Sequence, residues 1–155
     1  MSNKNINVLM DLYEIDKKCF YLSDAINNNI IEYGKFYKIN YSNDTVNLNA
    51  LNINIKFVLT NAIINNNRKI YQFTIDEVDK TSIIDLEKNL LKLCKFDHNE
   101  VYKLENIMSS GYFKLKTANK TDIIKLNKEH NIQLSITGIW EINNNIGINF
   151  KFIHL

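Results

Sequence analysis

The sequence contains no proline, only four glycines and only two cysteines among its 155 residues. Proline commonly ends helices and shapes turns, so this chain must turn by other means. Asparagine tolerates positive φ, and Asn and Ile together make up about a third of the chain. We therefore expect clusters of asparagine to mark the turns.

Cys19 and Cys94 lie far apart in the chain, each among apolar neighbours. No His or Cys stands near them at the spacing of metal ligands, so we expect two buried free thiols, no disulfide and no metal site. No stretch approaches the roughly 20 apolar residues of a membrane-spanning helix, and no signal peptide opens the chain. These absences favour a soluble, cytoplasmic protein, and the length favours a single domain over residues 1–155.

Residue patterns that would indicate catalysis are also missing. His98, His130 and His154 have no Ser, Cys or carboxylate partner in any local motif, so surface or hydrogen-bonded histidines are the simplest interpretation. The chain has no glycine-rich phosphate loop, and the acidic residues at 76–79 fit a solvated loop before a helix. The sequence therefore indicates a protein that is not an enzyme.

Residues 132–155 show the clearest structural pattern in the chain. Ile132, Leu134, Ile136 and Trp140 alternate with polar residues, with Gly138 in the same register, and the alternation resumes over residues 146–152 after three asparagines. Alternation of apolar and polar residues on both sides of an Asn-rich gap predicts a β-hairpin at the centre of the core. Trp140 then falls on the apolar face, which favours a core aromatic over a base-stacking one. Gly138 indicates a bend or a close approach to the backbone.

The same alternation predicts further strands at residues 35–41, 52–60, 68–76 and 112–116. Weaker candidate strands lie at residues 101–104 and 121–126. Turns are expected at 42–44 and 65–67, a loop at 23–29, and a strand or extended arm at 5–22. Residues 82–94 change to helical spacing through Ile83, Leu86, Leu90 and Leu93, with Ser82 as the expected cap. We therefore predict a mainly β protein with one amphipathic helix. Three strands, a helix and further strands is the order of the OB fold, a partly open five-stranded barrel.

Cationic and aromatic residues are interleaved at three places, 35–38, 68–71 and 112–116. Single-stranded nucleic acids bind where cations follow the phosphates and aromatic rings stack on bases. At 112–116, Tyr112, Lys114 and Lys116 share one strand face, opposite Phe113 and Leu115. The net charge of +2 is small, but residues 101–155 carry seven Lys against four acidic residues. Lysines that merely keep an exposed strand soluble are the alternative explanation.

The same C-terminal third carries a resemblance to a known family. Residues 112–116, then Gly138, Ile139 and Trp140, then Gly147 before the aromatic strand at 150–152, resemble the end of single-stranded-DNA-binding proteins of large DNA viruses and related linear plasmids. The resemblance covers roughly the last 45 residues and implies an OB-like domain that coats single-stranded DNA during replication and needs no cofactor. The abundance of Asn and Ile suits the AT-rich genome of such a source.

Two hypotheses of different class follow. The first is a sequence-independent single-stranded-DNA-binding protein, with RNA and a homo-oligomer left open. Its candidate contacts are Lys35, Tyr37, Lys38, Lys56, Arg68, Tyr71, Tyr112, Lys114, Lys116, Trp140 and Lys151. The second, favoured by the modest net charge, is a β-rich structural or interaction protein, such as a virion component or a host-factor inhibitor.

Overall fold

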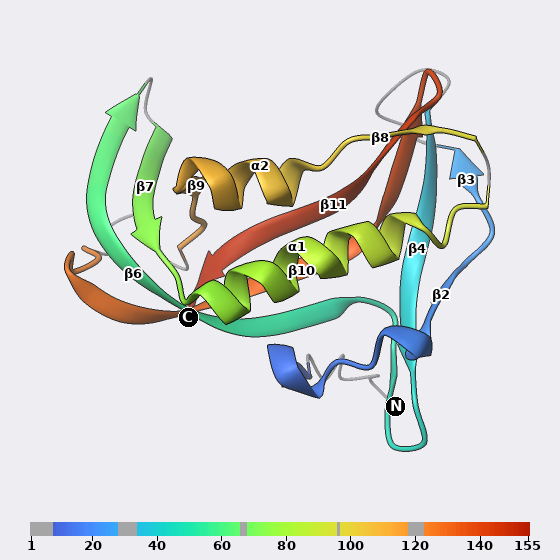
Figure 1. The fold of residues 1–155 in the computed structure, drawn as a ribbon, viewed down its shortest axis with the longest axis horizontal. Helices are drawn as coiled ribbons and strands as arrows, with labels where there is room; N and C mark the ends of the chain where they lie inside the picture. Colours follow the sequence, from blue (N-terminus) through green and yellow to red (C-terminus); the bar gives the residue numbers. More distant parts are fainter. Residues whose placement is uncertain (1–7, 28–33, 66–67, 96, 118–122) are drawn as a thin grey trace, which may run out of the picture.

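The computed structural model describes residues 8–27, 34–65, 68–95, 97–117 and 123–155. Within these ranges the protein is mainly β, as predicted, with eleven strands in one hydrogen-bonded sheet and two α-helices (Figure 1). The strands are β1 Leu9–Asp11, β2 Phe20–Leu22, β3 Ile26–Asn27, β4 Lys35–Ser42, β5 Asn47–Leu48, β6 Leu51–Asn65, β7 Arg68–Thr74, β8 Asn99–Glu100, β9 Tyr112–Lys114, β10 Lys128–Ile142 and β11 Asn145–His154. The α-helices are α1 Glu77–Leu91 and α2 Lys103–Ser110, and 3-10 turns occupy Leu12–Glu14 and Lys17–Cys19.

Strand β10 is central to the sheet, which confirms the predicted role of the C-terminal hairpin. One edge of β10 pairs with β11 along its length. The other edge pairs first with β6, through residues 128–136, and then with β4, through residues 138–141. The hairpin turns at Asn143 and Asn144, whose φ angles of 49° and 65° are positive, as a tight two-residue hairpin turn requires.

A β-bulge at Thr137 marks the place where β10 changes partners. Ile136 is opposite Phe150 and Gly138 is opposite Asn149, so β10 has one residue more than β11 at this point. The bulge moves the following residues to the opposite face of the sheet. Ile132, Leu134 and Ile136 are buried before it, whereas Ile139 is buried after it.

The expectation that Trp140 is a core aromatic is wrong, because the bulge places it on the other face of the sheet. Because the register shifts at Thr137, Trp140 leaves the apolar face and is only half-buried. The expected close approach at Gly138 is confirmed, since a Cβ there would lie 2.4 Å from both Phe36 Cζ and the Tyr37 carbonyl oxygen.

The sheet curves but does not form a closed barrel. Neighbours run in the order β10, β6, β7 and β9 on one side of β10, and β11 lies on its other side. Lys116, two residues past the short strand β9, forms an isolated parallel bridge to Ile153 of β11. Its amide donates to the Phe152 carbonyl at 2.9 Å, and the His154 amide donates to the Lys116 carbonyl at 2.8 Å. We call this narrow junction between the β9 segment and β11 the seam.

Helix α1 confirms the predicted amphipathic helix but begins five residues earlier than expected. Asp76 caps it, with its carboxylate accepting from the amides of Val78 and Asp79. The acidic residues at 76–79 are therefore the cap and first turn, where negative charge meets the positive end of the helix, and the predicted solvated loop is wrong. Ser82 lies inside the helix and does not cap it. Ile83, Leu86, Leu90 and Leu91 bury the inner face.

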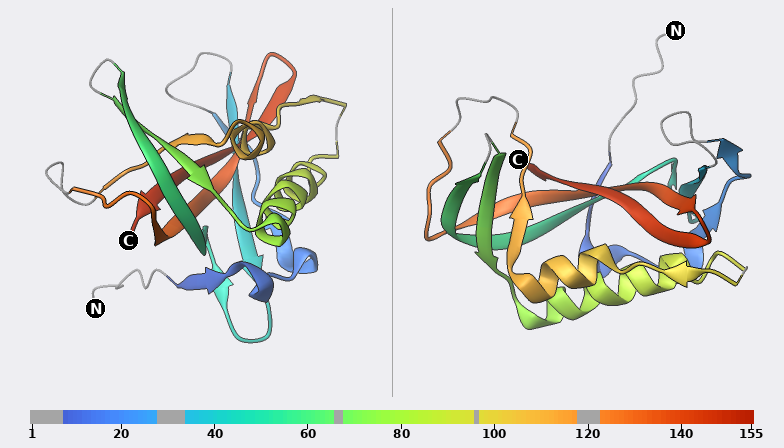
Figure 2. Two further views of the ribbon diagram at one scale, coloured as in Figure 1. Left: turned by 60° about the vertical axis from the view of Figure 1, so that its left-hand side comes forward. Right: turned by 90° about the horizontal axis from the view of Figure 1, so that it is seen from above.

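Helix α2 was missed, and the candidate strand at 101–104 is wrong. Leu104 and Met108 are buried at helical spacing, and Gly111 ends the helix at a φ of 75°. The two helices lie side by side on one side of the sheet (Figure 2). Glu87 of α1 joins them, because its carboxylate oxygens accept from the Leu104 and Glu105 amides at 2.9 and 2.8 Å.

The remaining expectations have mixed outcomes. The strands at 35–41, 52–60 and 68–76 are confirmed as β4, β6 and β7, with β6 extending further than predicted and β7 ending two residues earlier, at Thr74. The turn at 42–44 is made by Asn43, whose side chain accepts from the amides of Thr45 and Val46. The strand at 112–116 is confirmed only through Lys114.

The weaker predictions fare less well. The segment from residue 8 to 22 alternates short strands with 3-10 turns, and β3 interrupts the expected loop at 23–29. Residues 123–126 form no strand. Residues 5–7, 28–29, 66–67 and 121–122 of the predicted segments lie outside the described residues. Cys19 and Cys94 are free, as predicted, but half-buried. In the part of the chain that the structure describes, no helix is long and apolar enough to cross a membrane.

Candidate nucleic-acid interface

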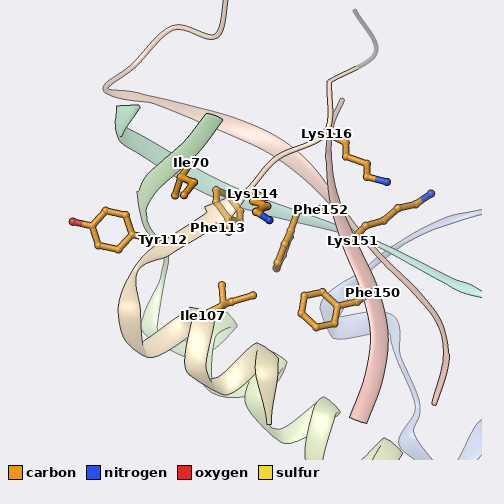
Figure 3. Close-up of a pocket in the computed structure, with 9 residues that line it drawn as sticks. All are labelled: Ile70, Ile107, Tyr112, Phe113, Lys114, Lys116, Phe150, Lys151 and Phe152. Atoms are coloured by element: carbon orange, nitrogen blue, oxygen red, sulfur yellow. The ribbon is translucent and has the colours of Figure 1, made fainter. Parts of the chain in front are cut away.

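A groove of about 440 Å³ opens along the seam, between α2 and β9 on one side and β11 on the other. We call it the seam groove, and Figure 3 shows its lining. It is lined by Ile70, Ile107, Tyr112, Phe113, Lys114, Lys116, Phe150, Lys151 and Phe152. Four of the candidate contacts, Tyr112, Lys114, Lys116 and Lys151, therefore come together here from two strands that are distant in sequence.

Aromatic rings form the floor of the groove. Phe113 and Phe152 are each 3% exposed, and their ring centroids are 4.8 Å apart. Phe150 packs against Phe152 at 5.8 Å but is only half-buried. Phe113 and Phe152 also contact Phe57 in the core, so the floor is fixed to the interior of the protein. Phe113 and Phe152 are too buried to offer a ring face, so of these three rings only Phe150 presents apolar surface to a planar ligand.

Lysines form the rim. Lys114, Lys116 and Lys151 are all exposed, and Lys116 and Lys151 extend in a similar direction, away from the aromatic rings (Figure 3). The backbone hydrogen bonds of Lys116 to β11 set this arrangement, because they place its side chain beside that of Lys151. Among the described residues that line the groove there is no carboxylate, so the local potential favours an anion. Tyr112 is 39% exposed and projects away at the far end (Figure 3).

A second hollow of about 400 Å³ continues along β11. We call it the tryptophan hollow; it is lined by Lys103, Trp140, Ile142, Ile148, Asn149 and Phe150. Phe150 belongs to both hollows, so together they follow β11 as one tract. Lys103, at the start of α2, places its Nζ 5.4 Å from the centroid of the Trp140 ring.

Two candidate contacts lie away from this tract. Lys56 forms an exposed ion pair with Glu129, with 3.5 Å between Nζ and Oε1, beside a different hollow that includes Asp76 and Asp79. Tyr71 is only 3% exposed and faces Phe113 across the β7–β9 pair. A buried ring has no face for a base, so we leave Tyr71 out of the interface.

Three more candidates lie on β4 and one on β7. Lys35 and Tyr37 line a separate hollow beside Cys94 and Lys95, and Lys38 is exposed opposite Gly138. Arg68 is exposed where β7 begins, near the end of a two-stranded ribbon that β6 and β7 extend beyond the sheet (Figure 1). The structure does not bring these residues to the seam groove.

Tyr37 instead belongs to a polar network with Glu141 and His98. The Tyr37 hydroxyl donates to Glu141 Oε2 at 2.7 Å, and His98 Nε2 lies 3.0 Å from Glu141 Oε1. Burial and this hydrogen bond raise the pKa of Tyr37 to about 12, and the same bond lowers the pKa of Glu141. The network ties the segment after α1 to β10 and β4, which is a structural role.

The other two histidines contact each other. His154 Nε2 lies 3.0 Å from His130 Nδ1, and His130 Nε2 lies 2.6 Å from the Lys125 carbonyl. The described ranges contain no group of three or more His, Cys, Asp or Glu that could hold a metal ion.

Several lining residues were not among the sequence-based candidates, including Phe150, Phe152, Ile107 and Lys103. Phe150 and Phe152 were assigned only to the apolar face of the hairpin. Ile107 and Lys103 were missed because α2 was missed. The helical spacing of Leu104, Ile107 and Met108 was the sequence signal that could have identified α2.

Comparisons of the chain with protein-family models, with curated proteins and with solved structures found no match. A proposal about function therefore has to be argued from the geometry of the tract and from the residues that line it.

Proposed function

We propose that this protein binds single-stranded nucleic acid, single-stranded DNA in the first instance, along the seam groove and without reading a base sequence. The observation that carries the proposal is the convergence of Lys114, Lys116 and Lys151 on an apolar groove floored by aromatic rings. A single strand exposes both its phosphates and its base faces, and this groove offers a partner for each. Duplex DNA hides its base faces inside the helix.

The architecture supports the proposal. A curved, mainly β sheet with two helices on one side is compatible with an OB-like fold, an architecture that often binds single strands. The resemblance of residues 112–116 and 138–152 to viral and plasmid single-stranded-DNA-binding proteins falls on β9, β10 and β11, the strands that line the tract. In this proposal the protein coats and protects single strands during replication of a viral or plasmid-like genome.

The lysines on the rim supply the decisive test. Removing two phosphate contacts lowers the slope of log affinity against log salt by roughly 1.4, at about 0.7 per contact for single strands. We expect this change for the double variant Lys114→Ala, Lys116→Ala, measured by fluorescence anisotropy with a labelled oligothymidine at several salt concentrations. Circular dichroism checks that the double variant is folded.

Lys56→Ala is the matched control, because Lys56 is an exposed strand lysine outside the tract. It should leave the slope nearly unchanged. Equal slopes for the parent and the double variant would remove the seam groove from the proposal. Equal affinity for a duplex of the same length would mean that general charge attraction explains the binding.

A second candidate function is contact with another protein through the β6–β7 ribbon. Ile63 and Ile64 near its end are 41% and 73% exposed, which is unusual for isoleucine. If the protein fails to bind either single strands or duplex, and if Ile63→Asn with Ile64→Asn abolishes self-association seen by sedimentation, this candidate is favoured instead.

A further inference from the structure

The only tryptophan in the chain lies in an unusual setting. Trp140 is opposite Gly147 in the β10–β11 pair, and a Cβ at Gly147 would lie 2.4 Å from Trp140 Cζ2. The ring therefore packs directly against the backbone of β11, in space that only glycine leaves open. The bulge at Thr137 places it outside the core, at the wall of the tryptophan hollow.

Lys103 lies over this ring. Its Nζ is 5.4 Å from the ring centroid, and it belongs to the first residue of α2. A cation over an indole is attracted by the ring face, but the interaction is weak at an exposed site and a stacked base can replace it. Lys103 itself is exposed, so its side chain can move without disturbing the core.

We propose that Trp140 is the stacking platform for one base of a bound single strand, and that Lys103 covers this platform in the free protein and moves to a neighbouring phosphate on binding. This inference rests on the proposed function. Continuity supports it, because Phe150 lines both hollows and a strand leaving the seam groove along β11 reaches Trp140 next. Charge also supports it, since Lys103 is the only charged residue among the described residues that line the tryptophan hollow.

The chain's single tryptophan makes a direct test possible. Oligothymidine is titrated into the parent protein while tryptophan emission and the anisotropy of a label on the oligonucleotide are followed together. Stacking of a base on indole quenches its emission, so the two signals should change with the same midpoint. Trp140→Ala should weaken binding about 5- to 150-fold at every salt concentration, as the loss of one stacked base does.

Gly147→Ala provides a variant that keeps the tryptophan. The added methyl group forces the ring away from its position, so we expect weaker binding and reduced quenching although the indole is still present. Trp140→Phe serves if Trp140→Ala does not fold, and circular dichroism monitors folding in each case.

Lys103→Gln tests the second half of the proposal. Its free form should show greater quenching of Trp140 by acrylamide, because the ring is uncovered. Its salt slope should fall by about 0.7, the value for one phosphate contact. Lys56→Gln, as control, should change neither quantity.

The possible outcomes distinguish failure of the Trp140 platform from failure of the proposed function. Anisotropy that reports binding while tryptophan emission stays constant overturns the platform and leaves the proposed function standing. An unchanged salt slope or unchanged acrylamide quenching in Lys103→Gln overturns the role of Lys103. An absence of binding in the anisotropy measurement overturns both the platform and the proposed function.

Discussion

At the scale of single residues, Glu87 is the charged side chain that the fold hides most completely. It is fully buried, and no other charged residue in the described ranges is classed as buried. Its carboxylate caps α2 from a neighbouring helix, accepting the Leu104 and Glu105 amides that the helix itself cannot pair. Burial raises its pKa, although the two backbone hydrogen bonds act in the opposite direction.

This raised pKa predicts a pH dependence of stability. A carboxyl group with a higher pKa in the folded state contributes stability below its unfolded value, about 4.3, and this contribution is lost as the pH rises through the folded pKa. The free energy of unfolding of the parent, minus that of Glu87→Gln, should therefore fall as the pH rises. Urea denaturation of both proteins over a pH series measures it.

The subtraction matters because other carboxyl groups, such as Glu141, have lowered pKa values and act in the opposite sense. A difference that increases with pH would mean that the hydrogen bonds to α2 outweigh burial.

At the scale of elements, the start of α1 distinguishes the predicted helix from the observed one. Asp76→Ala removes the side chain that caps two amides, so we expect a loss of about 0.5–2 kcal/mol in the free energy of unfolding. Ser82→Ala should change stability by no more than about 0.5 kcal/mol, because alanine suits a helix interior. Denaturant titration of the two variants decides between the two starting points, since a helix capped at Ser82 would reverse the order.

The longer strands could be predicted from the sequence because each carries its period-two pattern locally, whereas two-residue strands such as β3 and β8 are too short to show one. The start of α1 could not, since Glu77, Val78 and Thr81 of its first turns are exposed and the apolar period begins only at Ile83. Helix α2 was harder still: it is short, and the carboxylate that caps it comes from Glu87, on another helix.

The candidate site could be predicted only in part. The alternation at 112–116 correctly placed Tyr112 and Lys114 on the outer face and Phe113 inside. The meeting of Lys116 with Lys151 depends on the bridge between Lys116 and Ile153, a pairing of distant segments that no local pattern encodes. The buried position of Tyr71 and the exposure of Trp140 depend in the same way on register and on the bulge.

At the scale of the whole molecule, the seam joins the β9 segment to β11 through a single bridging pair and two backbone hydrogen bonds among the described residues. Stability is not uniform across a fold, and a junction with one bridging residue opens more easily than a central strand. We expect the amides of Lys116 and His154 to exchange at least about tenfold faster than buried amides of β10, a difference of about 1.4 kcal/mol in opening free energy.

Hydrogen exchange followed by NMR measures these rates residue by residue. Addition of a saturating single-stranded oligonucleotide should slow exchange at the seam more than elsewhere, because the proposed ligand contacts both of its sides. Equal protection of seam and centre in the parent would show that the junction opens only with the whole fold.

The extra residue at Thr137 has a consequence for how this surface can change. Upstream of it, the even-numbered residues of β10 face the core, and downstream the odd-numbered residue Ile139 does. The core-facing residues of β10 therefore change from even-numbered to odd-numbered at Thr137. Deleting Thr137 would make Ile136 and Gly138 consecutive opposite Phe150 and Asn149, so Ile139 would still face the core and Trp140 would stay on the outer face. A residue added to β11 between Asn149 and Phe150 would instead pair with Thr137 and turn Trp140 toward the core face. The exposure of the tryptophan is therefore set by the difference in length between the two paired strands.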